Sequence, residues 1–272
     1  MTKLYIVEGL PCSGKTTTSK YVAELLEKSG RTVKYVDEGS GDHPADYEFH
    51  AYITQEQLKN LEATMQIKIR QAATEKGAGY IVALSELADN EREQLLPYKI
   101  YDFLPWETEK PLLLERWKQF ADQAVREDFI YVFNCVFLQN PMCETMMRLN
   151  LPKEESFAYI EQIYNIISPL EPRIVYLKND DVAEQIQTTS EERPGWLDAV
   201  IDYHVNGGFG KSISASGFDG YLKCLEERQK RELEYLKMSK IDSVVIENAH
   251  RNWKRAYAQI AEQIVHMELL SC

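Results

Sequence analysis

The chain alternates between short apolar runs and longer stretches in which apolar residues recur every three or four positions. Short apolar runs predict buried strands, and the longer pattern predicts amphipathic helices. Because strands alternate with helices, we expect a three-layer α/β/α sandwich around a five-stranded parallel sheet. The predicted strands span Leu4–Val7, Arg31–Gly39, Asp128–Leu138, Pro172–Asp181 and Ile241–His250.

Two stretches interrupt this alternation. A long segment separates the second and third predicted strands and has helical patterns at Gln55–Lys76 and Pro111–Glu127. A glycine-rich stretch, Asn206–Gly220, follows the fourth strand and is typical of a segment that moves. We therefore expect one domain over residues 1–272, with a helical insert at 40–127 and a lid at 188–220.

The first strand leads into a helix through the sequence GLPCSGKT, which has the Walker A pattern G-x-x-x-x-G-K-T. Such a loop directs backbone N–H groups and a helix N-terminus at phosphate oxygens. Lys15 is expected to neutralise the β- and γ-phosphates, and the Thr16 hydroxyl to bind Mg²⁺. The residues assigned to the nucleotide site are Gly9, Pro11, Cys12, Ser13, Gly14, Lys15, Thr16 and Thr17.

Other nucleotide-binding signatures are missing from the sequence. D-x-x-G and N-K-x-D, which GTPases need, do not occur, and neither does the dinucleotide fingerprint G-x-G-x-x-G. The five histidines show no metal-ligand spacing, and no catalytic triad is suggested. The expected cofactors are therefore ATP and Mg²⁺.

The segment VEGLPCSGKTT resembles the opening of the deoxynucleoside kinase and thymidylate kinase group of P-loop NTPases. The layout is also similar to that group: an insert after the second strand, a lid after the fourth and a loop after the fifth. The resemblance implies that an acid ending the second strand orients the acceptor hydroxyl. Glu38 is favoured for this role and Asp37 is the second candidate; the alternative is that both are solvated turn residues.

The resemblance also implies an arginine that closes from the lid over the transferred phosphate. Arg193 is the first candidate and Lys211 the second, although Arg193 could equally pair with a neighbouring glutamate on the surface. The loop after the fifth strand is expected to flank the adenine. Asn248, His250 and Arg251 are the candidates there, and plain loop residues are the alternative.

One feature of that kinase group is absent. An acid–arginine pair is expected at the end of the third strand, where this chain has Asn134, Cys135, Gln139 and Asn140. An amide adds no negative charge for a metal ion. The Mg²⁺ site is therefore expected to depend on Thr16, phosphates and water, with Glu8 as a further candidate.

Charge and composition limit the classes of partner that we expect for this protein. The chain has 31 basic and 43 acidic residues, a formal charge of −12, which disfavours nucleic acid as a partner. Its short basic segments, Arg251–Arg255 and Glu227–Lys237, are interpreted as solvated helix faces. No apolar run is long enough to span a membrane, and an odd set of five cysteines is typical of reduced thiols, so we expect a cytoplasmic protein without a membrane partner. The sequence neither predicts nor excludes a homodimer.

These observations predict a phosphotransferase that moves the γ-phosphate of ATP to a hydroxyl of a small molecule. The acidic segment Gly41–Tyr52 and the lack of arginine between Arg31 and Arg70 favour a nucleoside-like or other neutral or cationic acceptor. Aromatic residues of the insert could line its pocket or belong to a core; they are Tyr98, Tyr101, Phe103 and Trp106.

Three alternatives stay open. A nucleoside monophosphate kinase would need arginines that converge on the acceptor phosphate; the candidates are Arg70, Arg92, Arg116, Arg126 and Arg148. A P-loop regulatory ATPase without an acceptor would explain the missing acid–arginine pair. An RNA kinase is disfavoured by the net charge.

Overall fold

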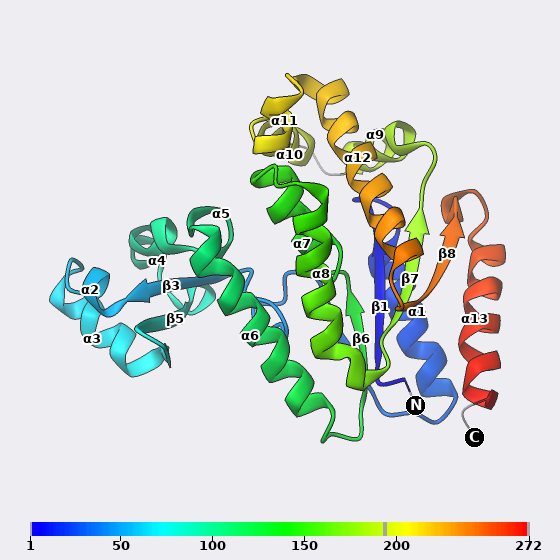
Figure 1. The fold of residues 1–272 in the computed structure, drawn as a ribbon, viewed down its shortest axis with the longest axis horizontal. Coiled ribbons are helices and arrows are strands. Elements are labelled where there is room, and N and C mark those ends of the chain that lie inside the picture. The colour runs from blue at the N-terminus through cyan, green and yellow to red at the C-terminus, as the bar shows by residue number, and fades with distance from the viewer. Residues whose placement is uncertain (1, 193–194, 271–272) are drawn as a thin grey trace. The chain divides into compact units, whose positions relative to one another are not determined.

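The structure, a computed structural model, describes residues 2–192 and 195–270. The chain divides into unit 1, Met1–Glu38 with Ala121–Cys272, and unit 2, Gly39–Phe120. Unit 1 contains the five-stranded parallel sheet that the sequence predicts, with helices on both faces (Figure 1). Its strands are β1 (Leu4–Gly9), β2 (Val33–Val36), β6 (Ile130–Asn134), β7 (Arg173–Lys178) and β8 (Asp242–Glu247).

The strand order β2-β6-β1-β7-β8 puts β1 at the centre of the sheet. Val7 pairs with Asn134 on β6 and with Val175 on β7. On the other side of β6, Val36 of β2 pairs with Phe133. Since parallel strands end at the same edge, the loops that follow β1, β2 and β6 gather there.

The helices of unit 1 alternate with its strands, as the sequence predicts. They are α1 (Lys15–Lys28), α7 (Gln139–Met142), η3 (Cys143–Arg148), α8 (Lys153–Ile167), η4 (Ser168–Leu170), α9 (Val182–Glu192), α10 (Trp196–Val205), α11 (Gly208–Ser212), α12 (Gly217–Met238), η5 (Ala249–Arg251) and α13 (Trp253–Leu270). The short segment η3 is a π-helix, a feature often found at functional sites.

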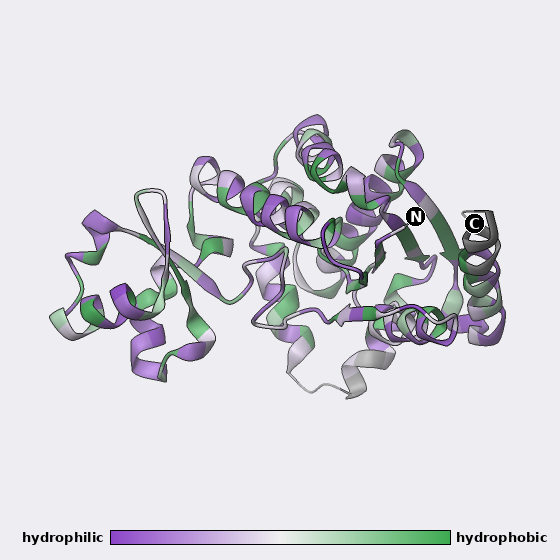
Figure 2. Cartoon of the chain, turned by 90° about the horizontal axis from the view of Figure 1, so that it is seen from below, coloured by the Kyte–Doolittle hydropathy of each residue, from purple (hydrophilic) through white to green (hydrophobic). Residues whose placement is uncertain are grey.

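The helices α1 and α13 cover one face of the sheet. Ala256, Ile260 and Ile264 recur every four residues on α13 and share a buried cluster with α1 and the strand residues Tyr5 and Val7. Figure 2 shows hydrophobic and hydrophilic residues alternating along the helical ribbons. This alternation follows from the helical period, which leaves one side of each helix for the core.

The helices α8 and α12 cover the opposite face. Successive side chains of a strand point to opposite faces of the sheet. Ile6 and Tyr176, each next in sequence to a member of the first cluster, therefore point to this second face and are fully buried. The Tyr176 hydroxyl donates to the Glu232 carboxylate on α12 at 2.6 Å, and the Tyr235 ring of the same helix packs against Phe137. This face therefore buries charged as well as apolar side chains.

Unit 2 contains an antiparallel sheet that the sequence pattern did not predict, in the order β3-β5-β4. Gln55–Lys76 is not one helix: a capping box at Thr54 begins a short helix, a second follows, and the end forms a strand. The elements of this region are β3 (His50–Thr54), α2 (Gln55–Leu58), α3 (Ala63–Ala72), β4 (Thr74–Lys76), β5 (Gly79–Ala83), η1 (Leu84–Glu86), α4 (Asp89–Leu95), η2 (Leu96–Tyr98), α5 (Ile100–Phe103) and α6 (Trp106–Ala124).

The glycine-rich stretch after β7, which was expected to move, is helical over part of its length. It contains α11 and the start of α12, and its glycines permit close packing. A Cβ added to Gly207 would lie 2.5 Å from the Met147 carbonyl oxygen, and one added to Gly208 would lie 2.6 Å from that of Arg148. Glycine serves a steric purpose here, because any side chain would collide with the backbone of η3.

We expect Ile260→Ala to reduce the free energy of unfolding by about 2–5 kcal/mol, because it leaves a cavity in the cluster between α13 and the sheet. Urea denaturation monitored by circular dichroism measures the change. Gln259→Ala, at an exposed position of the same helix, is the control and should shift stability by less than about 0.5 kcal/mol. Equal effects of both changes would contradict this account of the core.

Candidate functional site

The loop between β1 and α1 has the backbone shape of a phosphate-binding loop. Gly9 and Gly14 both have positive φ, 147° and 88°. A Cβ on Gly9 would lie 2.7 Å from the Leu177 carbonyl oxygen, and one on Gly14 would lie 2.4 Å from the Trp253 ring. Both positions thus require glycine for two reasons: the backbone has positive φ, and neighbouring atoms leave no room for a side chain.

Positive charge gathers at the start of α1. The first turn of this helix holds no acidic residue, and its first N–H groups have no partner within the helix. The Lys15 side chain is buried and its ammonium donates to the Leu10 carbonyl at 3.1 Å, which folds it back over the loop. Helix N-terminus and ammonium together make this a strong site for phosphate oxygens.

Asn134, at the end of β6, connects the loop to the end of β2. Its amide nitrogen donates to the Thr16 hydroxyl at 3.0 Å and to the Asp37 carboxylate at 2.7 Å. Its amide oxygen is buried and has no hydrogen-bond partner within the part of the chain that the structure describes. Three oxygen-bearing side chains therefore lie together beside the first turn of α1.

Glu8, a further candidate for the metal site, is hydrogen-bonded to the loop after β6. Its carboxylate is fully buried and accepts the backbone N–H groups of Phe137 and Leu138, both at 2.8 Å, and that of Gln139 at 3.3 Å. Burial, with the nearby charge of Glu232, raises the pKa of Glu8 to about 7. Glu8 thus holds the loop after β6 in place.

Arg228 of α12 is a buried cation beside the phosphate-binding loop. Its guanidinium donates to the Glu232 carboxylate at 2.7 Å, to the Gly9 carbonyl at 3.2 Å and to the Gln139 side-chain oxygen at 3.3 Å. A further N–H points at the Cys143 sulfur at 3.5 Å. Burial opposes its charge, but Glu232 more than offsets this and keeps the pKa of Arg228 well above its usual value.

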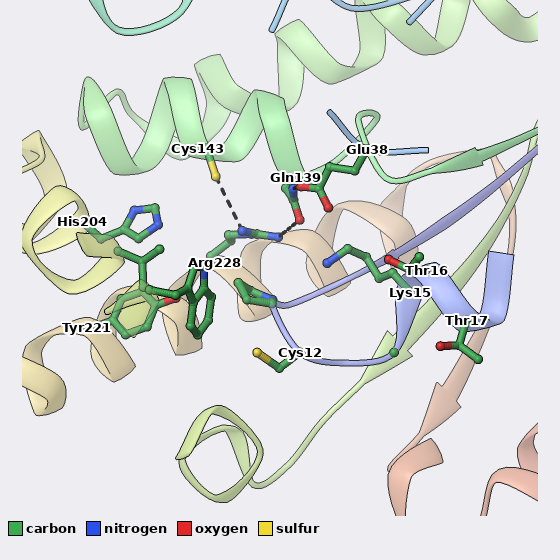
Figure 3. Close-up of a pocket in the computed structure, with 14 residues that line it drawn as sticks. Cys12, Lys15, Thr16, Thr17, Glu38, Gln139, Cys143, His204, Tyr221 and Arg228 are labelled. Atoms are coloured by element: carbon green, nitrogen blue, oxygen red, sulfur yellow. Dashed lines mark hydrogen bonds between the residues drawn. The ribbon is translucent and has the colours of Figure 1, made fainter. Parts of the chain in front are cut away.

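Several of these groups line one cavity of about 520 Å³, shown in Figure 3. Lys15 and Thr16 lie at one end, Arg228 in the middle, and His204 with Tyr221 at the other end. Glu38 lies near the middle, where the Gln139 amide donates to its carboxylate. The lining residues are Pro11, Cys12, Gly14, Lys15, Thr16, Thr17, Glu38, Gln139, Cys143, Trp196, Val200, His204, Tyr221 and Arg228, all of unit 1.

Most residues that the sequence assigned to the nucleotide lie at this cavity. Pro11, Cys12 and Thr17 line it together with Gly14, Lys15 and Thr16, whereas Gly9 and Ser13 support the loop. Of the two candidate bases, Glu38 lines the cavity and Asp37 lies against Asn134.

The other candidates are two basic residues and residues of the loop after β8. Arg193 is outside the described residues, and Lys211 is exposed on α11. Asn248 and Arg251 line a second hollow of about 490 Å³ beside β8 and α13, where the Asn248 amide donates to Asp180 at 2.7 Å. This bond joins the ends of β7 and β8.

The residues considered for acceptor recognition in the insert have local partners or are exposed. Tyr101 donates to the Asp46 carboxylate, and Phe103 is 57% exposed. Three of the arginines considered for a nucleoside monophosphate kinase have local partners: Arg70 donates to Tyr80, Arg92 to carbonyls of its own unit, and Arg148 to Glu144.

Sequence reasoning missed Arg228 because Glu227–Lys237 was interpreted as a solvated face. A signal was present: Tyr221, Cys224, Leu225, Arg228, Glu232 and Tyr235 recur at helical spacing and form one buried stripe. An arginine and a glutamate four residues apart inside an apolar stripe indicate a buried ion pair.

The comparisons with known proteins agree with this geometry. A family model described as "Chromatin associated protein KTI12" matches residues 2–78, which include β1, the phosphate-binding loop, α1 and β2. No curated protein matches the chain. The chain has the fold of a P-loop NTPase. The family match covers less than a third of the chain, so it supports nucleotide binding by the P-loop and leaves the acceptor to be inferred from the site.

One further property concerns membranes. Among the helices of residues 2–192 and 195–270, none combines the length and the apolar character that a membrane span requires.

Glu8 should make the stability of unit 1 depend on pH. Between about pH 4.5 and 7 the folded chain keeps a proton on Glu8 that the unfolded chain releases, so stability falls as pH rises through this interval. We expect a loss of up to about 3 kcal/mol between pH 5 and pH 7.5, measured by urea denaturation.

The variant Glu8→Gln retains an oxygen acceptor but has no proton to release. Its stability should change less than that of the native chain over the same interval. An identical pH dependence in both proteins would show that Glu8 does not bind the proton.

Proposed function

We propose that the protein is an ATP- and Mg²⁺-dependent phosphotransferase that transfers the γ-phosphate to a hydroxyl group of a small molecule. The observation that carries the proposal is that one cavity joins the phosphate-binding loop to Glu38 and continues past Arg228 to an uncharged end. A protein that only hydrolyses ATP has no need for a second compartment. A phosphotransferase needs one for the acceptor, held in line with the phosphate.

In this mechanism Lys15 and the N–H groups at the start of α1 stabilise the negative charge of the transferred phosphate. Glu38 accepts a hydrogen bond from the acceptor hydroxyl and orients its oxygen toward the γ-phosphorus. A new oxygen–phosphorus bond forms while the bond between the γ-phosphorus and the bridging oxygen breaks, and that oxygen leaves with ADP. The hydroxyl proton passes to Glu38 and then to water.

The residues beside Thr16 suit Mg²⁺. The Thr16 hydroxyl, the Asp37 carboxylate and the buried, unpartnered oxygen of Asn134 are the hard oxygen donors that this ion and its bound water prefer. Thr16 would hold it directly, with Asp37 supplying the negative charge that Asn134 lacks. When bound, Mg²⁺ would reduce the repulsion between the phosphates and an approaching hydroxyl oxygen.

A second candidate function is a regulatory ATPase. The observation that favours it is the amide of Asn134 at the end of β6, where the resemblance to kinases implied an acid. In that case ATP hydrolysis would be slow, and no hydroxylated compound would accelerate it.

The first test is ADP release from ATP and Mg²⁺ with a panel of nucleosides, sugars, amino alcohols and aminoglycosides. We expect one acceptor class to accelerate release. Lys15→Ala should lower the accelerated rate by about 10²-fold or more, and Glu38→Gln by about 10²- to 10⁴-fold. Glu27→Gln, at an exposed position of α1, is the control and should match the native rate.

ATP affinity, measured by calorimetry, should be nearly unchanged in Glu38→Gln, because this side chain meets the acceptor. A slow ADP release that no acceptor accelerates would refute the phosphotransferase and support the regulatory ATPase.

The proposed role of Asp37 has its own test. Asp37→Asn keeps an oxygen that can accept the Asn134 hydrogen bond but removes the charge. We expect the affinity for Mn²⁺, used in place of Mg²⁺, to fall roughly tenfold in the presence of a non-hydrolysable ATP analogue. Electron paramagnetic resonance titration of free Mn²⁺ measures this, with Asp180→Asn as the control; equal affinities in all three proteins would exclude Asp37 from the metal site.

A further inference from the structure

The far end of the cavity is made by two helices that follow β7. Trp196, Val200 and His204 are four residues apart, so they lie on one face of α10, and this face lines the cavity. Tyr221, in the first turns of α12, completes the wall (Figure 3). The His204 and Tyr221 rings are stacked, with centroids 5.4 Å apart and planes inclined by 10°. The far end is therefore a fixed aromatic wall.

Two polar atoms of this wall are buried without a partner. Neither His204 Nδ1 nor the Tyr221 hydroxyl has a hydrogen-bond partner within residues 2–192 and 195–270. His204 is 9% exposed and Tyr221 is fully buried, so neither side chain is well solvated. Leaving such groups unpaired costs free energy, and both side chains line a cavity in which a ligand could pair them.

The wall carries no charge of its own near neutral pH. Burial, together with the charge of Arg228, lowers the pKa of His204 to about 4, so the imidazole is neutral. Burial also raises the pKa of Tyr221, which keeps its hydroxyl protonated. Among the described residues that line the cavity, Arg228 is the cation on this side, and it is already paired with Glu232 at 2.7 Å. A charged group placed at this end would lose its hydration without gaining a free counter-charge from the part of the chain that the structure describes.

We propose that this end of the cavity is the acceptor subsite and that it selects an uncharged alcohol with a flat ring, hydrogen-bonded by Tyr221 and His204. The proposal rests on the phosphotransferase function and specifies its substrate class. The ring packs against Trp196 and Val200, and its hydroxyl is directed back toward Glu38 and the phosphate-binding loop. This location differs from the insert, where sequence reasoning sought the acceptor.

The test is a binding experiment that needs no phosphate transfer. The probe is 4-hydroxybenzyl alcohol, added to the full chain loaded with Mg²⁺ and a non-hydrolysable ATP analogue. Saturation-transfer NMR measures its affinity and those of benzylamine, benzoate and glycerol, which are cationic, anionic and without a ring. We expect the probe to bind at least several-fold more tightly than each of these three compounds.

The matched variants are Tyr221→Phe, which removes one buried hydroxyl, and Tyr203→Phe, which removes one from an exposed ring on α10. Tyr221→Phe should weaken probe binding roughly 3- to 10-fold, as expected for one lost hydrogen bond, and should leave nucleotide affinity unchanged. Tyr203→Phe should bind the probe like the native chain.

The outcomes separate this proposal from the proposed function. Probe binding that depends on Tyr221, without acceptor-stimulated ADP release, would keep the subsite and refute the phosphotransferase. Transfer to a charged or ringless acceptor, unaffected by Tyr221→Phe, would keep the phosphotransferase and overturn the subsite. No probe binding, or equal binding of all four compounds, would also overturn the subsite.

Discussion

The buried guanidinium of Arg228 is the interaction on which the whole cavity depends. It bonds at once to the end of β1, to Gln139 after β6 and to Glu232 on its own helix. A buried charge is tolerated only when its hydrogen bonds are satisfied, so these three elements must keep their relative positions. The same helix carries Tyr221 two turns earlier. Arg228 thus fixes the distance between the phosphate-binding loop and the aromatic wall.

The negative charge beside the loop comes from Asp37, the residue that follows β2. Val36 pairs with Phe133 across β2 and β6, so the next residues, Asp37 and Asn134, meet at the end of the sheet. The amide of Asn134 bonds to both Thr16 and Asp37. The acid therefore lies one strand farther from β1 than the kinase resemblance implied, and the amide connects it to the loop. An acid at position 134 instead would repel Asp37.

The features that sequence predicted best are those encoded by neighbouring residues. The parallel sheet follows from short apolar runs, and the Walker A pattern of Gly9–Thr16 specifies its own turn and helix start. Features that depend on distant partners were not predicted. Arg228 and Glu232 looked solvated because their partners, Gly9 and Tyr176, lie far away in sequence. The glycines near Gly207 suggested mobility because composition cannot show that η3 packs against them.

The two ends of the cavity differ in the kind of atoms that form them. The nucleotide end uses backbone groups and Lys15, which bind phosphate whatever the acceptor is. The far end uses side chains of α10 and α12, whose shape and polarity can change without disturbing the loop. Glu38, Gln139, Cys143 and Arg228 lie between them, and Glu38 orients the acceptor hydroxyl in the proposed mechanism. In the proposed acceptor subsite, changes at Trp196, His204 and Tyr221 would therefore alter specificity while phosphate binding is preserved.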